Sequence, residues 1–308
     1  MVGEAYDSGL SYFPKVFRRC TLGNIPQLAA AVGNFSCPSR FAKKMGAEMG
    51  SISTVYGPVR SWRVGLSLGV DLLCINSICS FRCNYCQLGK INVHTDERRV
   101  YVPTERVMAD LRASQWQEAD VITLSGSGEP TLAANIGEVI EEIKALTGKP
   151  IVVLTNASTL NEAGVRRDLR GADKVFCKLD AVDDYTLKII NRPVKGITLR
   201  SIVDGIKVFK KEYEGHLGIQ SMLQRLNSKY VRQLARLLIE ICPDEVQINL
   251  PLRPIPRTWR LEARGNNDSY SVPAIRPKTI RREEIARIEA TLRDLTGLKI
   301  ISVYPQGN

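Results

Sequence analysis

Short apolar runs alternate with amphipathic stretches along most of this chain. The runs Val-Ile-Thr-Leu at 121–124 and Ile-Val-Val-Leu at 151–154 carry no charge, which is typical of strands buried on both faces of a parallel sheet. Between such runs, apolar residues recur every three or four positions, as on the buried face of a helix. The pattern predicts strands at Val70–Ile75, Asp120–Ser125, Pro150–Thr155, Lys174–Leu179, Leu217–Leu223, Glu245–Leu250 and Lys299–Tyr304. It predicts helices at Pro103–Ser114, Ile136–Leu146, Glu162–Leu169, Asp183–Ile190, Leu199–Tyr213, Tyr230–Ile241 and 282–295.

This alternation of strands and helices predicts an α/β fold. Two architectures satisfy it, an open Rossmann-like sheet and a partial barrel, and the apolar pattern is the same for both. In either one the carboxyl ends of the parallel strands share one edge, where ligands gather. The residues that follow each strand are therefore the first candidates for a binding site.

The first 52 residues differ from the rest, because their apolar residues show only weak periodicity. We expect an N-terminal extension there, with short helices at Ile25–Val32 and Phe41–Met49. Cys20 and Cys37 stand too far apart in the sequence to form a tight metal-binding pair, so we expect them to be structural or free thiols.

Composition narrows the class of protein further. Of the 308 residues, 44% are hydrophobic and 24% are charged, which is ordinary for a globular chain. No apolar run reaches the roughly 20 residues that a membrane helix needs, and the N-terminus lacks the basic and apolar regions of a secretory signal. Eight cysteines in such a chain argue against a disulfide framework. We therefore expect a cytoplasmic protein without a membrane partner.

The chain is strongly basic, with 43 Lys and Arg against 32 Asp and Glu and a formal net charge of +11. Such a balance favours partners that carry negative charge, nucleic acid among them. A high net charge also keeps a protein soluble, so the charge leaves both interpretations open.

Three cysteines follow the first predicted strand, Cys79, Cys83 and Cys86, at C-x3-C-x2-C spacing. Thiolates at this spacing can converge on one metal centre, because the loop between them can curl around it. A [4Fe–4S] cluster normally takes four thiolates, so three leave one iron open for another ligand. Cys74 offers a second interpretation, a four-thiolate zinc site, although only Cys83 and Cys86 form the tight pair that such sites use twice. We favour the cluster, with Cys74 as a buried structural cysteine.

Around these cysteines the chain resembles the radical SAM superfamily. Tyr85 stands just before the last cysteine, where that motif carries an aromatic residue. The glycine- and arginine-rich segment Val55–Asp71, with Cys86–Gly89 and Val102–Arg106, is similar to a group of iron–sulfur oxidoreductases related to wyosine-type tRNA-modifying enzymes. The resemblance implies a [4Fe–4S] cluster on the three cysteines, S-adenosyl-L-methionine (SAM) on the open iron, and an electron donor such as ferredoxin or flavodoxin.

The resemblance also implies a fold and an activity. Radical SAM cores are partial (β/α)6 barrels, so we expect an α/β, TIM-like partial barrel of parallel strands at 53–252, after the N-terminal extension at 1–52. Residues 253–308 would add a basic loop, a helix and a strand that complete or cover the barrel. The implied reaction cleaves SAM to a 5'-deoxyadenosyl radical that abstracts hydrogen from an unidentified substrate, with RNA and other anions as candidates. The alternative is a non-catalytic zinc or iron–sulfur module associated with RNA.

The strand ends supply the expected SAM contacts. After the second predicted strand comes the glycine turn, Gly126–Pro130, which resembles the Gly-Gly-Glu-Pro motif of the superfamily, with Ser127 in place of the first glycine. In the family this turn, which here contains Gly128 and Glu129, binds the SAM amino group mostly through backbone carbonyls. We therefore expect a side chain at Gly128 to weaken SAM binding and to leave the cluster intact. The resemblance implies further contacts at later strand ends, with Asp180 as the ribose ligand: Asn156, Lys178, Asp180, Gln220 and Asn249.

A basic segment with several prolines follows the sixth predicted strand. It carries Arg253, Arg257, Trp259, Arg260 and Arg264, and its prolines predict an extended loop rather than a helix. Guanidinium groups suit phosphate oxygens, and an indole ring offers a stacking face for an unpaired base. The segment is either a lid for RNA or another phosphorylated substrate, or a solvated loop whose tryptophan packs on the barrel.

Overall fold

The computed structural model describes residues 52–74, 76–265 and 273–303. The helices expected at Ile25–Val32 and Phe41–Met49, and with them Cys20 and Cys37, lie outside the described residues. The cysteine motif is described in full, and so are the predicted strands, except for the single end residues Ile75 and Tyr304.

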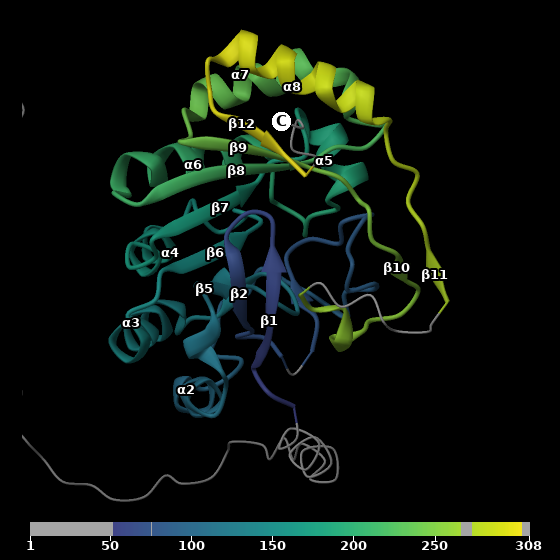
Figure 1. The fold of residues 1–308 in the computed structure, drawn as a ribbon. Helices are drawn as coiled ribbons and strands as arrows, with labels where there is room; N and C mark the ends of the chain where they lie inside the picture. Colours follow the sequence, from purple (N-terminus) through teal and green to yellow (C-terminus); the bar gives the residue numbers. More distant parts are fainter. Residues whose placement is uncertain (1–51, 75, 266–272, 304–308) are drawn as a thin grey trace, which may run out of the picture. The chain divides into compact units, whose positions relative to one another are not determined.

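A curled sheet of eight strands forms the centre of the fold (Figure 1). At one edge, β1 (Val55–Ser61) pairs antiparallel with its neighbour β2. The other strands all run parallel and are, in sheet order, β2 (Gly65–Val70), β5 (Val121–Leu124), β6 (Ile151–Thr155), β7 (Lys174–Lys178), β8 (His216–Met222), β9 (Glu245–Asn249) and β12 (Ile300–Ser302). This arrangement confirms the predicted α/β partial barrel.

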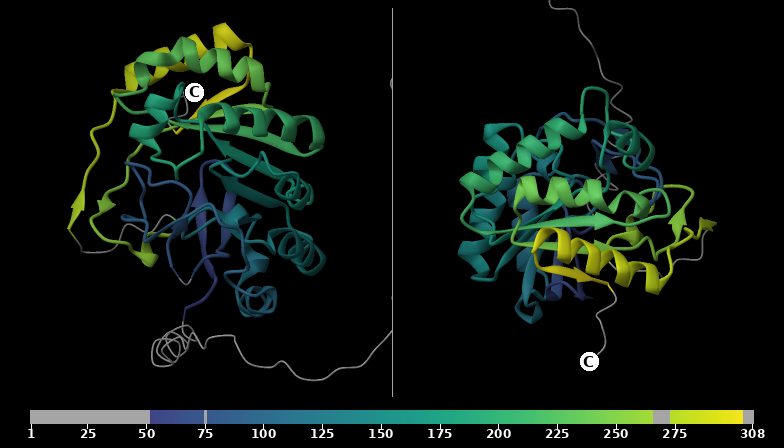
Figure 2. Two further views of the ribbon diagram at one scale, coloured as in Figure 1. Left: turned by 180° about the vertical axis from the view of Figure 1, so that it is seen from behind. Right: turned by 90° about the horizontal axis from the view of Figure 1, so that it is seen from above.

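Helices surround the sheet, and most of them pack along its outer face (Figure 2). They are α2 (Thr104–Arg112), α3 (Ile136–Thr147), α4 (Ala163–Asp168), α5 (Asp184–Ile190), α6 (Leu199–Glu212), α7 (Val231–Ile241) and α8 (Arg282–Thr296). In α3, Ile136, Val139, Ile140 and Ile143 recur every three or four positions and are all fully buried, which explains why the periodicity predicted this helix. None of the described helices has the length and apolar character needed to cross a bilayer.

Two pairs of very short strands lie outside the main sheet. β3 (Ile78–Cys79) pairs parallel with β4 (Val93–His94), and we call residues 78–94, which contain the three motif cysteines, the cysteine loop. β10 (Ile255–Pro256) pairs antiparallel with β11 (Ala274–Ile275). We call residues 250–265 the C-terminal strap; it is extended, as its prolines predict, except for one 3-10 turn at Leu261–Ala263.

The first parallel strand lies earlier in the chain than its apolar residues indicate. β2 ends at Val70, so the prediction of a strand at Val70–Ile75 was wrong. An Asp71 carboxylate oxygen accepts a hydrogen bond from the Leu73 backbone N–H at 2.9 Å, which turns the chain away from the sheet. Leu72 and Leu73 are apolar because they are buried in the core, not because they pair in the sheet.

The glycine- and arginine-rich segment before that turn forms the β1–β2 hairpin, which the apolar pattern did not predict. Gly69 allows the Tyr56 ring of β1 to cross directly over β2, since a Cβ on Gly69 would lie 2.1 Å from that ring. The tip of the hairpin, Trp62–Val64, lies at the amino-terminal end of β2. This pairing places the tip at the end of the barrel opposite to the cysteine loop.

Candidate active site

Backbone hydrogen bonds join the cysteine loop to the glycine turn. The Ile78 N–H donates to the Ser127 carbonyl at 3.1 Å, and the Glu129 N–H donates to the Ile78 carbonyl at 3.0 Å. Only glycine fits at position 128 between them, because a Cβ on Gly128 would lie 1.7 Å from the Ile78 oxygen. The glycine turn therefore fixes the position of Cys79, which follows Ile78.

The three motif thiols share a partly buried loop. Burial raises the pKa of Cys79, Cys83 and Cys86, that of Cys83 to about 12, and neighbouring thiols add to the rise at Cys79 and Cys83. Side-chain amides face two of the sulfurs: Asn156 Nδ2 lies 3.6 Å from Cys79 Sγ, and Asn191 Nδ2 lies 3.5 Å from Cys83 Sγ. Because thiols bind metals as thiolates, positive metal charge would stabilise the ionised form that burial disfavours.

The arrangement of these thiols suits a cluster better than a single zinc ion. Within the described residues, no three His, Cys, Asp or Glu side chains converge closely enough to hold one metal ion. Zinc needs every sulfur ligand at about 2.3 Å from one centre, whereas a [4Fe–4S] cluster can bind each cysteine through a different iron. Cys74 is buried in the main apolar core, and this burial raises its pKa to about 11.

The Glu129 carboxylate is fully engaged with the protein. It accepts hydrogen bonds from the Thr131 N–H at 3.1 Å, the Thr131 hydroxyl at 2.7 Å, the Thr155 hydroxyl at 2.6 Å and the Asn156 N–H at 2.6 Å. Burial raises the pKa of Glu129, and these hydrogen bonds oppose the rise. The side chain thus ties the glycine turn to the end of β6, and both of its oxygens are occupied within the protein.

A buried ion pair holds the glycine turn from the other side. One Asp71 oxygen accepts hydrogen bonds from the Ser127 N–H at 3.0 Å and from its hydroxyl at 2.5 Å, and Arg264 Nη1 lies 3.1 Å from the same oxygen. The Arg264 guanidinium also lies 4.9 Å from the centre of the Tyr56 ring. Arg264 belongs to the C-terminal strap, so this ion pair fastens the strap to the glycine turn.

The strap also packs on the cysteine loop. A Cβ on Gly89 would lie 2.3 Å from the Thr258 oxygen, and the Arg260 N–H donates to the Leu88 carbonyl at 3.0 Å. Trp259 is partly buried, and its indole nitrogen is shielded from solvent, which agrees with a tryptophan packed on the protein rather than an open stacking face. Arg257, by contrast, is exposed.

Asp180, the expected ribose ligand, is fully buried and has partners within the chain. Its carboxylate accepts hydrogen bonds from the Tyr85 hydroxyl, from Asn191 Nδ2 at 2.7 Å and from the Met222 N–H at 2.7 Å. Lys178 Nζ lies 3.1 Å from one of its oxygens. Since Tyr85 is the aromatic residue of the cysteine motif, Asp180 fixes that ring within the loop.

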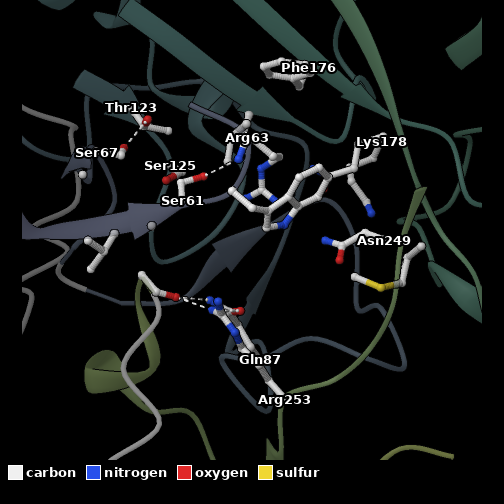
Figure 3. A pocket seen from close by; sticks show the side chains of 18 of the residues that line it. Ser61, Arg63, Ser67, Gln87, Thr123, Ser125, Phe176, Lys178, Asn249 and Arg253 are labelled. Carbon is white, nitrogen blue, oxygen red and sulfur yellow. Dashed lines mark hydrogen bonds between the residues drawn. The ribbon is translucent and has the colours of Figure 1, made fainter. Parts of the chain in front are cut away.

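A cavity of about 400 Å³ opens beside Cys86 and continues into the barrel (Figure 3). Its volume lies within the range of about 300–1,000 Å³ typical of small-molecule sites. Five of the expected SAM contacts line it: Gly126, Gly128, Lys178, Gln220 and Asn249. The other expected contacts are buried behind this lining: Ser127, Glu129, Pro130, Asn156 and Asp180.

Other side chains reach the cavity from places that sequence reasoning missed. Trp62 and Arg63 come from the tip of the β1–β2 hairpin, and Gln87 and Arg253 come from the cysteine loop and the strap. Arg253 Nη1 donates to Gln87 Oε1 at 2.7 Å. The arginine-rich sequence of the hairpin indicated that this segment carries cations, but it did not show which arginine faces the cavity.

The fold and the site together define a class, the iron–sulfur enzymes built on a parallel half-barrel. A family model described as the radical SAM superfamily matches residues 73–238, which is more than half of the chain. The chain therefore belongs to the radical SAM superfamily. It is a radical SAM enzyme, and its cofactors are a [4Fe–4S] cluster and SAM.

The chain is also similar to individual proteins and to solved structures. A UPF0026 protein of Synechocystis is 50% identical over 214 residues, which cover 69% of this chain and 81% of the relative. A UPF0026 protein of Methanocaldococcus jannaschii is 31% identical over 210 residues, covering 66% of this chain and 65% of the relative. A solved radical SAM methyltransferase from Sphaerobacter thermophilus shares the fold with a TM-score of 0.55 and 15% identity, over 88% of this chain and 83% of that one.

Proposed function

We propose that Cys79, Cys83 and Cys86 bind the cluster and that SAM binds at the mouth of the cavity, beside Cys86 and the glycine turn. When bound, the cluster and SAM together supply a 5'-deoxyadenosyl radical that abstracts hydrogen from the substrate. The observation that carries this proposal is the pairing of Ile78 with Gly128, because it sets the glycine turn against the cysteine loop.

Strand-end side chains supply the remaining contacts to SAM in this proposal. Lys178, Gln220 and Asn249 end the neighbouring strands β7, β8 and β9 or lie near their ends, and all of them line the cavity. Their ammonium and amide groups suit the carboxylate and the ribose hydroxyls of SAM. Gly126 and Gly128 keep the turn free of side chains where the amino group would bind.

The buried members of the expected site position these contacts. Glu129 and Asn156 connect the glycine turn, the end of β6 and Cys79. Asp180 holds both Lys178 and Tyr85. We assign positioning roles to these side chains, because their polar atoms are already bonded within the protein.

The substrate in this proposal is an anion. Besides Lys178, which is assigned to SAM, Arg63 and Arg253 line the cavity, and no Asp or Glu is among its lining residues in the described part of the chain. Such a site favours carboxylates and phosphates electrostatically. The barrel walls would also keep water away from the radical.

A nucleotide of an RNA is the second candidate for the substrate. The formal net charge of +11 and several exposed cations on and beyond the strap favour it: Arg257, Arg276, Lys278 and Arg281. The same positive charge suits an acidic electron donor such as ferredoxin or flavodoxin.

Anaerobic reconstitution tests the proposal against a non-catalytic zinc or iron–sulfur module associated with RNA. We expect about four irons and four sulfides per chain, and 5'-deoxyadenosine when SAM and a strong reductant are added. A chain that binds zinc, holds no cluster and leaves SAM intact would contradict the proposal.

A further inference from the structure

The cations that line the cavity differ in what they already contact. Lys178 lies 3.1 Å from Asp180, and Arg253 donates to the Gly265 carbonyl at 2.5 Å. In the part of the chain that the structure describes, the Arg63 guanidinium has neither a carboxylate partner nor a hydrogen-bond acceptor. Arg253 is close enough to repel it and so to lower its pKa.

Arg63 is held in place without being neutralised. Its backbone N–H donates to the Ser61 hydroxyl at 3.3 Å, and its guanidinium carbon lies 5.3 Å from the centre of the Trp62 ring. Burial and the nearby Arg253 lower the pKa of Arg63 from 12.5 to about 10, so the group is still charged near neutral pH. A partly buried cation of this kind is stabilised by an anion that it can bind.

The position of Arg63 separates it from the glycine turn. Arg63 lies just before β2 (Gly65–Val70), whereas the glycine turn follows β5, the parallel neighbour of β2. Strands rise about 3.3 Å per residue, so the two ends of β2 are about 17 Å apart. The Arg63 backbone and the glycine turn therefore lie at opposite ends of β2, although both line the same cavity. The effect of Arg63→Gln on SAM affinity distinguishes an anion bound by Arg63 from the amino acid moiety of SAM.

Part of the cavity wall is apolar, although Ser61, Ser67 and Thr123 also line it. Val152, Leu154 and Phe176 line it and form, with Val64, part of a small apolar cluster separate from the main core (Figure 3). An apolar surface beside an unpaired guanidinium suits a ligand with an anionic end and an apolar body.

We propose that Arg63 binds the carboxylate or phosphate of a small substrate whose apolar body packs on Val152, Leu154 and Phe176. This inference rests on the proposed function and names the class of its substrate. A guanidinium can bind either anion through two parallel N–H···O hydrogen bonds. The cavity of about 400 Å³ has to accept SAM as well, which limits the substrate to a small molecule.

A binding experiment tests the inference without requiring turnover. Cluster-loaded protein with SAM bound is titrated with phenyl phosphate, benzoate and neutral benzamide, and tryptophan fluorescence and calorimetry follow the binding. We expect at least one of the anions to bind at least tenfold more tightly than benzamide. The tighter anion identifies the anionic group as phosphate or carboxylate.

Variants then locate the bound anion. Arg63→Gln should raise the Kd for the preferred anion at least tenfold and change the Kd for SAM by less than threefold. Arg63→Lys keeps the charge but loses the planar pair of donors, so its effect should be smaller. Arg112→Gln, an equal loss of charge at an exposed position on α2, should leave both Kd values unchanged.

Several results would overturn the inference. It fails if neither anion binds the parent protein, or if Arg63→Gln and Arg63→Lys bind the preferred anion as the parent does. An equal loss of SAM affinity in Arg63→Gln would assign Arg63 to SAM instead. Failure of the proposed function is seen separately, as the absence of 5'-deoxyadenosine when the parent protein is given SAM and reductant.

Discussion

At the residue scale, Cys83 and Cys74 show how position decides the role of a buried thiol. Cys83 lies in the motif loop beside the Asn191 amide, whereas Cys74 packs in the main core. Cys83→Ala should abolish both the visible absorbance of the cluster and the cleavage of SAM. Cys74→Ala should retain both and cost roughly 1 kcal/mol of stability, because it leaves a small cavity.

Iron and sulfide analysis, with denaturant unfolding of each variant, measures these outcomes. Loss of the cluster in Cys74→Ala would make Cys74 a ligand and restore the four-thiolate interpretation.

The Glu129 carboxylate gives a second prediction at this scale. Every polar partner of Glu129 donates to it, including two backbone N–H groups. In Glu129→Gln the new amide NH2 must face one of these donors, which should cost about 1–3 kcal/mol and weaken SAM binding through displacement of the glycine turn. Thermal unfolding and SAM titration check this, with Glu141→Gln on the exposed face of α3 as the control. Unchanged stability in Glu129→Gln would contradict this prediction, because it would show that the hydrogen bonds around Glu129 contribute little to the free energy of unfolding.

The strand-end rule predicted which residues gather at the site but not which of them face the cavity. Lys178 and Asp180 both lie at the carboxyl end of β7, where the rule predicted them. Lys178 lines the cavity, whereas Asp180 is buried against Tyr85. That partner is 95 positions away in the sequence. Local sequence shows that a side chain reaches the carboxyl edge of the sheet, but long-range partners decide whether its polar atoms remain available.

At the scale of elements, burial determines what the sequence could predict. The central strands are buried on both faces, so their apolar runs predicted them to within a residue or two. β1 lies at an edge of the sheet, and all of its residues except Val55 are only partly buried or exposed, so its sequence lacks the apolar run of a buried strand. The hairpin that carries Arg63 follows instead from the pairing of β1 with β2, in which the Tyr56 ring lies over Gly69.

The pairing of the cysteine loop with the glycine turn yields the prediction at this scale. A side chain at Gly128 was expected to affect SAM alone, but its first atom would lie 1.7 Å from the Ile78 oxygen. Gly128→Ala should therefore displace Cys79 and reduce the cluster content as well as SAM affinity. Gly164→Ala in α4 is the matched control, because its nearest neighbours would be 3.8 Å away.

Iron content per folded chain distinguishes the two views of Gly128. If Gly128→Ala holds a full cluster but binds SAM more weakly, Gly128 acts only on SAM binding, as the motif by itself suggests.

At the scale of the whole molecule, the positive charge serves more than one purpose. Many basic side chains are engaged internally: Arg264 pairs with Asp71, and Arg98 lies 2.8 Å from Asp168. The composition favoured anionic partners but left solubility as an equal interpretation, because it could not separate these internal pairs from cations that remain exposed. The strap shows both kinds, since Arg264 is buried and Arg257 is exposed.

Substitution of exposed cations tests whether the substrate is RNA or a small anion. Arg260 is unsuitable for this test, because its backbone donates to Leu88 and its Nε is buried. Changing Arg257 and Arg276 to Glu should weaken the binding of bulk tRNA and reduce its salt dependence, by about one unit of slope for each phosphate that is no longer bound. Arg112 and Arg232, exposed on α2 and α7, changed to Glu together, give a control of equal net charge.

Competition in the cavity completes this test. If the substrate is a small anion bound by Arg63, tRNA should not displace phenyl phosphate or benzoate from the cluster-loaded protein, because its binding to exposed arginines requires no entry into the barrel. Tryptophan fluorescence at physiological salt measures the displacement. The opposite result has two parts: tRNA fully displaces the small anion from the parent protein, and the Arg257 and Arg276 double variant loses both this displacement and its affinity for tRNA. That result would show that a nucleotide of RNA enters the cavity, and it would make RNA the substrate.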